Sequence, residues 1–377
     1  MRKWNIARRH LHASYSPFCV LMSLLLAARG LTADLQPQVL EPVGISADGA
    51  SFVLKRSGDR FVPWGFNYLG ESDTVFEEYW AEKWPAIEED FREMKKLGAN
   101  VVRVHLQLGT YMAAADRTRP EELARLRKLL DLAQATGLYL DVTGLGCYHL
   151  AKVPVWLDAL DEQQRWEVQA RFWRAVARTC KGHPAVFCYD LMNEPVVTEA
   201  KPGEPPWLTG ELGGLYFVQR ISNKPGGRAQ RDIAAAWVAR MTKAIREVDP
   251  EHLITVGVIP WAMVWPNAKP VFYAPAAAGH LDFVSVHFYP QAGKVKEALA
   301  ALKVYDVGKP MVVEEIFPLN CSLAELDEFM RGGGGIVEGW ISHYFGRSIA
   351  DYAGEKDMKS AVMQQFLEYW QNKAPRP

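Results

Sequence analysis

A regular alternation of short apolar runs and amphipathic stretches constrains the fold of this chain more than any other feature. Apolar residues recur at helical spacing in one stretch after another, and each stretch is followed by a short run rich in β-branched and aromatic residues. The runs with strand character cover residues 61–67, 101–106, 138–142, 185–192, 253–258, 283–288, 311–313 and 336–340. Near-continuous apolar strands are typical of a parallel sheet that helices cover on both faces.

Eight strand–helix units in succession predict an α/β fold, a closed (β/α)8 TIM barrel. An open doubly wound sheet is the alternative, but no glycine-rich phosphate-binding loop follows any of the predicted strands. Ahead of the barrel, residues 51–54 and 61–64 flank a turn that contains glycine, which predicts a small N-terminal β-hairpin. Residues 196–227, rich in Pro and Gly, follow the fourth strand, and we expect them to form a long loop that shapes the site.

The first residues of the chain have the pattern of an export signal. Four basic residues within positions 1–9 precede an apolar run over 17–28, and Leu31-Thr32-Ala33 follows. The apolar run is shorter than the roughly 20 residues that span a bilayer. We therefore expect residues 1–33 to be a signal peptide, residues 34–377 to be one catalytic domain, and the protein to be secreted or periplasmic. The alternative is an uncleaved signal that stays as a membrane anchor.

The charge balance and the cysteine spacing narrow the classes of partner. The chain has 43 basic and 44 acidic residues, so no electrostatic footprint for nucleic acid or an anionic membrane is predicted. The cysteines lack the paired spacing of metal ligands, and no metal or other cofactor is expected. The 13 tryptophans allow two interpretations: they pack in a core, or they form platforms that stack on sugar rings.

Two strands of the predicted barrel end in glutamates. Glu194 stands at the end of the fourth strand, and the pair Glu314-Glu315 stands at the end of the seventh. Catalytic residues of barrel enzymes lie at the carboxyl ends of the strands, and the fourth and seventh strands face each other across the central cavity. Glycoside cleavage needs two such carboxyl groups, one to protonate the leaving oxygen and one to attack the anomeric carbon. Separations of about 5–5.5 Å give retention of configuration, and separations of about 6.5–9.5 Å give inversion.

Four short motifs in the expected order resemble glycoside hydrolase family 5, of clan A. They are Tyr-Asp-Leu-Met-Asn-Glu-Pro ending at Pro195, Lys-Pro-Met-Val-Val-Glu-Glu ending at Glu315, Val-Val-Arg-Val around Arg103, and His287-Phe288-Tyr289. The resemblance extends over residues 61–340. It implies a barrel fold, with Glu194 as the acid/base and Glu315 as the nucleophile of a retaining mechanism.

The resemblance also implies a set of substrate-binding residues, namely Arg103, Asn193, His287, Tyr289 and Trp340. Arg103 and Tyr289 would keep the nucleophile ionised, and Asn193 would bind the 2-hydroxyl of the sugar. His287 would contact the substrate or the acid/base, and Trp340 would form the floor below the sugar.

The sequence departs from the family pattern next to the nucleophile. Ile316 and Phe317 follow Glu315, where an aromatic residue and then glycine are usual. The two adjacent glutamates also leave the choice of nucleophile open. Alternation along a strand predicts that Glu314 and Glu315 point to opposite faces, so that only one faces the cavity. The alignment of the motif favours Glu315.

The sequence thus predicts a retaining glycoside hydrolase that cleaves β-linked polysaccharides or oligosaccharides, either β-mannan or β-glucan. The glutamate doublet favours β-mannan. The residues of the Asn-Glu-Pro strand also resemble those of enzymes that act on β-glucans or on glycolipid glycans. A non-catalytic carbohydrate-binding barrel is the main alternative. A metal-dependent barrel enzyme is a further one, which loss of activity on chelation would reveal.

Overall fold

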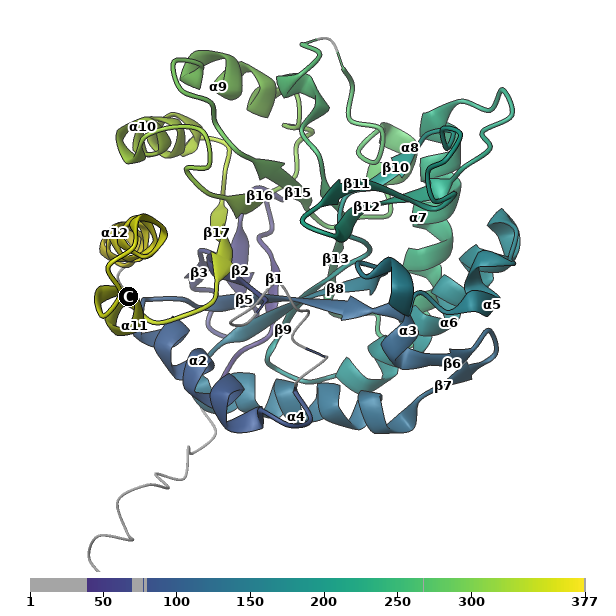
Figure 1. Ribbon diagram of the computed structural model, residues 1–377, viewed down its shortest axis with the longest axis horizontal. Coiled ribbons are helices and arrows are strands. Elements are labelled where there is room, and N and C mark those ends of the chain that lie inside the picture. Colours follow the sequence, from purple (N-terminus) through teal and green to yellow (C-terminus); the bar gives the residue numbers. More distant parts are fainter. Residues whose placement is uncertain (1–38, 70–76, 78–79, 267, 376–377) are drawn as a thin grey trace, which may run out of the picture. The chain divides into compact units, whose positions relative to one another are not determined.

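A sheet of parallel strands forms the centre of the fold (Figure 1). The computed structural model describes residues 39–69, 77, 80–266 and 268–375, so the expected signal peptide lies outside the described residues. The described residues cluster as one unit. Along the sheet the strands are β13 (Leu253–Thr255), β9 (Val186–Asp190), β8 (Tyr139–Gly146), β5 (Val101–Gln107), β4 (Trp64–Tyr68), β17 (Gly339–Phe345), β16 (Met311–Ile316), β15 (Val284–Phe288) and β14 (Gly257–Val258).

The sheet closes on itself through its two end strands. β13 pairs with β9, and β14 pairs with β15, both in parallel register. β13 and β14 are consecutive parts of one stretch that is interrupted only at Val256, and they count as one barrel strand. The nine strands therefore form a barrel of eight strand positions, which we call staves. The predicted (β/α)8 barrel is confirmed, and the open sheet is excluded.

Helices surround the barrel on its outer side (Figure 1). The longer ones are α2 (Trp84–Lys96), α4 (Pro120–Thr136), α6 (Glu162–Cys180), α7 (Gln230–Arg246), α9 (Val295–Lys303), α10 (Leu323–Gly333) and α12 (Met358–Lys373). Short helical turns lie in the connections, at α3 (Leu108–Tyr111), η2 (Leu150–Lys152), α5 (Val155–Asp158), η3 (Trp261–Met263), α8 (Pro275–Ala278) and α11 (Ile349–Ala353). Apolar faces of these helices pack on the strands in one large core. Within the described part of the chain, no helix is long and apolar enough to cross a membrane.

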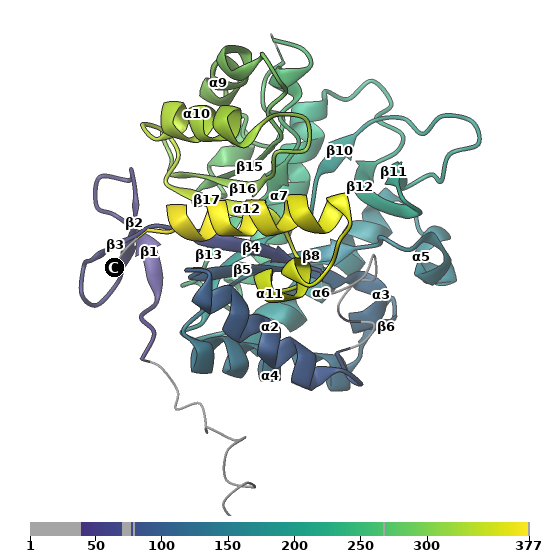
Figure 2. The same cartoon turned by 60° about the vertical axis from the view of Figure 1, so that its left-hand side comes forward.

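The predicted N-terminal hairpin forms and gains a third strand. β1 (Val43–Ile45), β2 (Phe52–Leu54) and β3 (Arg60–Phe61) make an antiparallel sheet. The ring of Phe52 lies 5.4 Å from that of Phe187 and 5.1 Å from that of Phe283, at the starts of two barrel strands. Burial of these rings closes the amino-terminal end of the barrel, opposite to the end that bears β10–β12 (Figure 2).

The segment expected as a long loop after the fourth strand forms a small sheet. Its strands β10 (Pro195–Val197), β12 (Leu215–Ser222) and β11 (Leu208–Leu212) pair in that order. A second small hairpin, β6 (Met112–Ala114) and β7 (Arg117–Thr118), follows the second barrel strand. Both additions therefore lie in connections that begin at the carboxyl ends of barrel strands.

The eighth barrel strand differs from its predicted position. Residues 336–340 were the expected strand, whereas β17 begins at Gly339 and continues to Phe345. Trp340 is therefore near the start of the strand, and Ser342, His343 and Tyr344 approach its carboxyl end. The difference arises because polar residues interrupt the apolar run, so the periodicity hides the second half of the strand.

Candidate active site

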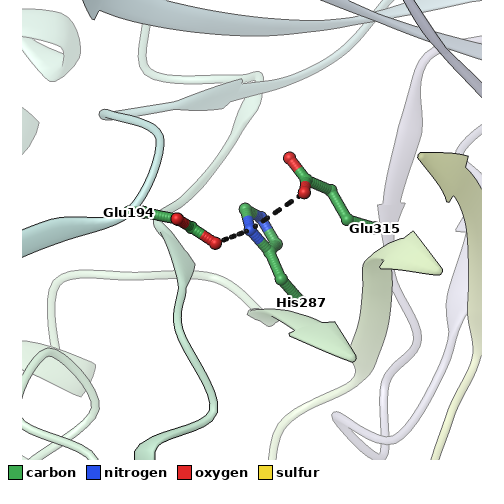
Figure 3. A group of neighbouring side chains, drawn as sticks. All are labelled: Glu194, His287 and Glu315. Carbon is green, nitrogen blue, oxygen red and sulfur yellow. Dashed lines mark hydrogen bonds and ion pairs between the residues drawn. The ribbon is translucent and has the colours of Figure 1, made fainter. Parts of the chain in front are cut away.

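Two glutamates and a histidine meet at the carboxyl ends of the barrel strands (Figure 3). Glu194 follows β9, His287 belongs to β15 and Glu315 to β16. His287 Nδ1 lies 2.8 Å from Glu194 Oε1 and 3.5 Å from Glu315 Oε2. One nitrogen atom of His287 and one carboxylate oxygen of each glutamate lie within 4.8 Å of one another. The structure thus brings the two predicted glutamates together on either side of an imidazole ring.

The backbone holds Glu194 in an uncommon conformation. Its φ is +47°, in the left-handed region that residues other than glycine seldom adopt. Its N–H donates to the carbonyl oxygen of Gly257 at 2.9 Å, and Leu191 N–H donates to that of Thr255 at 2.9 Å. These bonds tie the turn after β9 to the fifth stave. Such strained residues concentrate at functional sites.

Glu315 is buried and surrounded by donors. Arg103 Nη1 lies 2.7 Å from Oε1, and the Tyr289 hydroxyl donates to Oε2 at 2.6 Å. His343 Nδ1 lies 3.3 Å from the same Oε2. Burial by itself would raise the pKa of Glu315, but the positive charge of His287, the His343 ring and Arg103 hold this pKa well below its usual range. The carboxylate is therefore an anion at neutral pH.

Arg103 connects the parts of the site. The guanidinium is fully buried, and its Nη2 donates to Asp190 Oδ2 at 2.7 Å and to Asn193 Oδ1 at 3.0 Å. Its Nη1 donates to Asn67 Oδ1 at 2.9 Å as well as to Glu315. Arg103 thus links the first, second, fourth and seventh staves, and its planar fork suits this role better than a lysine would.

Next to Arg103 on the same face of β5 lies His105, a neutral histidine. Burial and the charge of Arg103 lower the pKa of His105 well below its ordinary value. Its Nε2 lies 3.0 Å from Asn67 Oδ1, and its Nδ1 lies 2.7 Å from the Tyr148 hydroxyl. Because Asn67 Oδ1 is an acceptor, Nε2 carries the proton and Nδ1 accepts from Tyr148.

The small sheet after the fourth strand reaches the site through Phe217. Asn193 Nδ2 donates to the Phe217 carbonyl oxygen at 2.9 Å, and the Phe217 ring lies 5.1 Å from that of Tyr148. Asn193 is therefore held between Arg103 and the inserted sheet. This contact places the insertion at the rim of the site.

Glu314 also points into the barrel, contrary to the prediction from strand alternation. Val286 pairs with Val313, but the next residue of β15, His287, pairs with Glu315. One extra residue on β16 is a β-bulge, and a bulge suspends the alternation of faces. Glu314 Oε2 consequently lies 3.5 Å from Arg103 Nη2 and 3.5 Å from His287 Nε2. The two neighbouring glutamates therefore share the barrel interior at different depths.

Trp340 is the one predicted site residue that the structure does not bring to this cluster. Its ring lies edge-on to Phe329 of α10, 5.9 Å between centroids, and is 7% exposed. It therefore packs between the barrel and α10. His343, three residues later, takes a place beside Glu315 and is 41% exposed at its side chain. The sequence signal for His343 would have been a polar residue at the true end of the strand.

Glu194, His287 and Glu315 are also a group of residues whose atoms could hold a metal ion. Burial would lower the pKa of His287, but the surrounding carboxylates, Glu315 first, raise it to about 10. A protonated imidazole has no lone pair to offer a metal, and Arg103 already neutralises Glu315. The arrangement thus suits two carboxyl groups on either side of a cationic imidazole better than a coordinated metal ion.

Comparison with known proteins shows the family of this chain. The model of the cellulase family, glycosyl hydrolase family 5, matches residues 63–316. The chain belongs to glycosyl hydrolase family 5. It is therefore a glycoside hydrolase. The predicted site residues Arg103, Asn193, Glu194, His287, Tyr289 and Glu315 all lie within the matched region. No curated protein matches the sequence.

Solved structures of family 5 enzymes share the fold. An exo-β-1,4-mannosidase from Opitutaceae bacterium strain TAV5 is 20% identical with a TM-score of 0.64, over 88% of this chain and 62% of that one. A β-1,4-mannanase from the sea hare Aplysia kurodai is 17% identical with a TM-score of 0.54, over 86% and 96%. The catalytic domain of an endoglucanase from Thermobifida fusca is 15% identical with a TM-score of 0.56, over 88% and 97%. This chain thus spans less than two thirds of the mannosidase.

Proposed function

We propose that this family 5 enzyme hydrolyses β-linked mannan or glucan chains with retention of anomeric configuration. The observation that carries the proposal is the approach of Glu194 and Glu315, whose oxygens come within 4.8 Å. Retaining enzymes hold their carboxyl groups about 5–5.5 Å apart, whereas inverting enzymes leave about 6.5–9.5 Å for a water molecule. The short separation therefore favours direct attack on the sugar by one carboxylate.

In the first step Glu315 attacks the anomeric carbon, while Glu194 gives its proton to the leaving glycosidic oxygen. The carbon–oxygen bond to the leaving group breaks as the ester bond to Glu315 forms. In the second step Glu194, now a carboxylate, takes a proton from water, and the water oxygen displaces Glu315. Two inversions give net retention, and both glutamates return to their initial protonation states.

Several neighbours support this division of roles. Arg103 and Tyr289 hold Glu315 as an anion, as attack requires. The Glu194 side chain is 17% exposed, so it is accessible from outside the barrel. Asn193, next to Glu194 and anchored by Arg103, is placed to hydrogen-bond the sugar at the cleavage point. His343 replaces Trp340 as the side chain expected to contact that sugar.

For the substrate, we propose a β-1,4-linked mannosyl or glucosyl chain. Support comes from the names of the structural neighbours, which include an exo-β-1,4-mannosidase, a β-1,4-mannanase and an endoglucanase. The Glu314-Glu315 doublet favours mannan as the first substrate to test.

The test is a panel of mannan, glucomannan, mixed-linkage glucan, cellulose and xylan, followed by proton NMR of the first product formed. We expect one of the mannose- or glucose-based polymers to be cleaved and the β-anomer to appear first, before mutarotation. Early appearance of the α-anomer would contradict retention. Binding without release of any sugar would instead support a carbohydrate-binding barrel.

A further inference from the structure

Glu314 is a fully buried carboxylate that the proposed double displacement does not use. Its Oε1 accepts from the Ser285 hydroxyl at 3.0 Å, and Asn67 Nδ2 donates to its backbone oxygen at 2.8 Å. Its Oε2 lies 3.5 Å from both Arg103 Nη2 and His287 Nε2. A buried charge needs such partners, since desolvation alone costs several kcal/mol per ion.

Space for this carboxylate depends on Gly257 of β14. A methyl group at position 257 would come within 2.5 Å of Glu314 Oε2, 2.8 Å of His287 Nε2 and 3.1 Å of Arg103 Nη2. These three side chains therefore converge on one point of the barrel interior. Burial would raise the pKa of Glu314, but Arg103 and His287 lower it to about 2, so Glu314 is ionised. Burial and the charge of Glu314 raise the pKa of Asp141 well above its usual range, so Asp141 is neutral.

His287 thus has a carboxyl group at each ring nitrogen. Nδ1 faces Glu194 Oε1 at 2.8 Å, and Nε2 faces Glu314 Oε2 at 3.5 Å. The 3.5 Å between Nε2 and Oε2 is an ion-pair distance without a hydrogen bond, so Glu314 acts on the ring through its charge. A buried carboxylate beside an imidazole favours the doubly protonated, cationic ring. The bulge in β16 is what allows Glu314 to reach Nε2 while Glu315 still faces the cavity.

We propose that Glu314 is a positioning residue for the acid/base, because its carboxylate keeps His287 doubly protonated with Nδ1–H directed at Glu194. The inference rests on the proposed role of Glu194. In this arrangement the imidazolium occupies Oε1 of Glu194, and the other carboxyl oxygen holds the proton for the leaving group. When that proton has gone, the new carboxylate faces a cation already in place. His287 itself neither gains nor loses a proton during the cycle.

The test measures the protonation of His287 directly, by NMR of the full chain with isotopically labelled histidine and with His287→Gln to assign the signal. The charged and titratable groups around this ring are Glu194, Glu314, Glu315, Arg103 and His105. In Glu314→Gln, which keeps the shape but removes the charge, we expect the pKa of His287 to fall by about 1–3 units. The alkaline limb of kcat/KM should move to lower pH in the same variant.

Ser285→Ala is the matched control, because it removes the hydrogen bond to Oε1 and keeps the charge. It should leave the pKa of His287 and the alkaline limb in place. An unchanged His287 in Glu314→Gln would overturn the proposal. If Glu314→Gln does not fold, Glu314→Asp is the second variant, because it moves the carboxylate away from His287 by one methylene group. An unchanged pKa of His287 in Glu314→Asp would also overturn the proposal. The NMR result does not need turnover, so it remains decisive even if no substrate is cleaved.

Discussion

The two glutamates on either side of His287 have different neighbours. Glu315 lies beside Arg103, the Tyr289 hydroxyl and His343. Glu194 contacts the imidazole of His287, and its side chain is 17% exposed. Donors stabilise the ionised form of a carboxyl group, so these contacts support the proposal that Glu315 is the nucleophile. The adjacent residue Glu314 is more deeply buried, and its carboxylate faces Arg103 and His287.

Replacement of Tyr289 by phenylalanine tests how Glu315 is kept ionised. The variant removes the 2.6 Å hydrogen bond to the carboxylate, so the pKa of Glu315 rises and its ionised form is lost at a higher pH. We expect the acidic limb of kcat/KM to move upward by about one pH unit, the equivalent of one charge-assisted hydrogen bond. Tyr305→Phe, remote from Glu315, serves as the control. A limb that stays in place or moves downward would show that Tyr289 does not stabilise the anion.

Replacement of Glu194 by alanine tests the acid/base role. Natural glycosides need a proton on the leaving oxygen, so we expect a loss of about 10²–10⁴-fold on polysaccharide. An aryl glycoside with an acidic phenol leaves without that proton, so its first step should be much less affected, and a glycosyl-enzyme should accumulate. Rates on the two kinds of substrate, together with mass spectrometry of the protein, give the answer. Equal losses on both would argue against the role.

At the level of single strands, apolar periodicity predicted the positions of most barrel strands. It did not predict the β-bulge at Glu314 or the end of β17, which both shape the site. The ends of β5, β9 and β15 lie close to their predicted places, and Arg103, Glu194 and His287 follow from them. The bulge at Glu314 depends on pairing with both neighbouring strands, which no local pattern contains. The end of β17 is hidden by its polar residues, and for that reason His343 was missed and Trp340 was misplaced.

A pair of variants separates the roles of the two residues on β17. Trp340→Phe leaves a void against Phe329, so we expect the free energy of unfolding to fall by about 1–3 kcal/mol with little change in kcat and KM. His343→Ala should do the reverse, with altered kinetics and nearly unchanged stability, because the side chain is 41% exposed beside Glu315. Denaturant unfolding and steady-state kinetics measure both. A selective rise of KM in Trp340→Phe would return Trp340 to the sugar site.

At the scale of the whole molecule, the barrel brings together residues from opposite ends of the chain. Asn67, Arg103, Asn193, His287 and Glu315 come from five staves. The sequence could predict each one at a strand end, but not that Arg103 would bridge Asp190 and Glu315. Such contacts depend on barrel closure, which sets the distance between strands four and seven. Cleavage of the signal and secretion stay predictions, since residues 1–33 lie outside the described part.

The most direct test of the account is chemical rescue of Glu315→Ala on an activated β-glycoside. The variant should fold and lose hydrolysis, and added azide should fill the space of the carboxylate, restore cleavage and yield the α-glycosyl azide. Glu314→Ala, measured alongside, should give no azide product, because its carboxylate does not reach the sugar. Persistent hydrolysis by Glu315→Ala, or an α-glycosyl azide from Glu314→Ala alone, would contradict the assignment and move the nucleophile to the neighbouring glutamate.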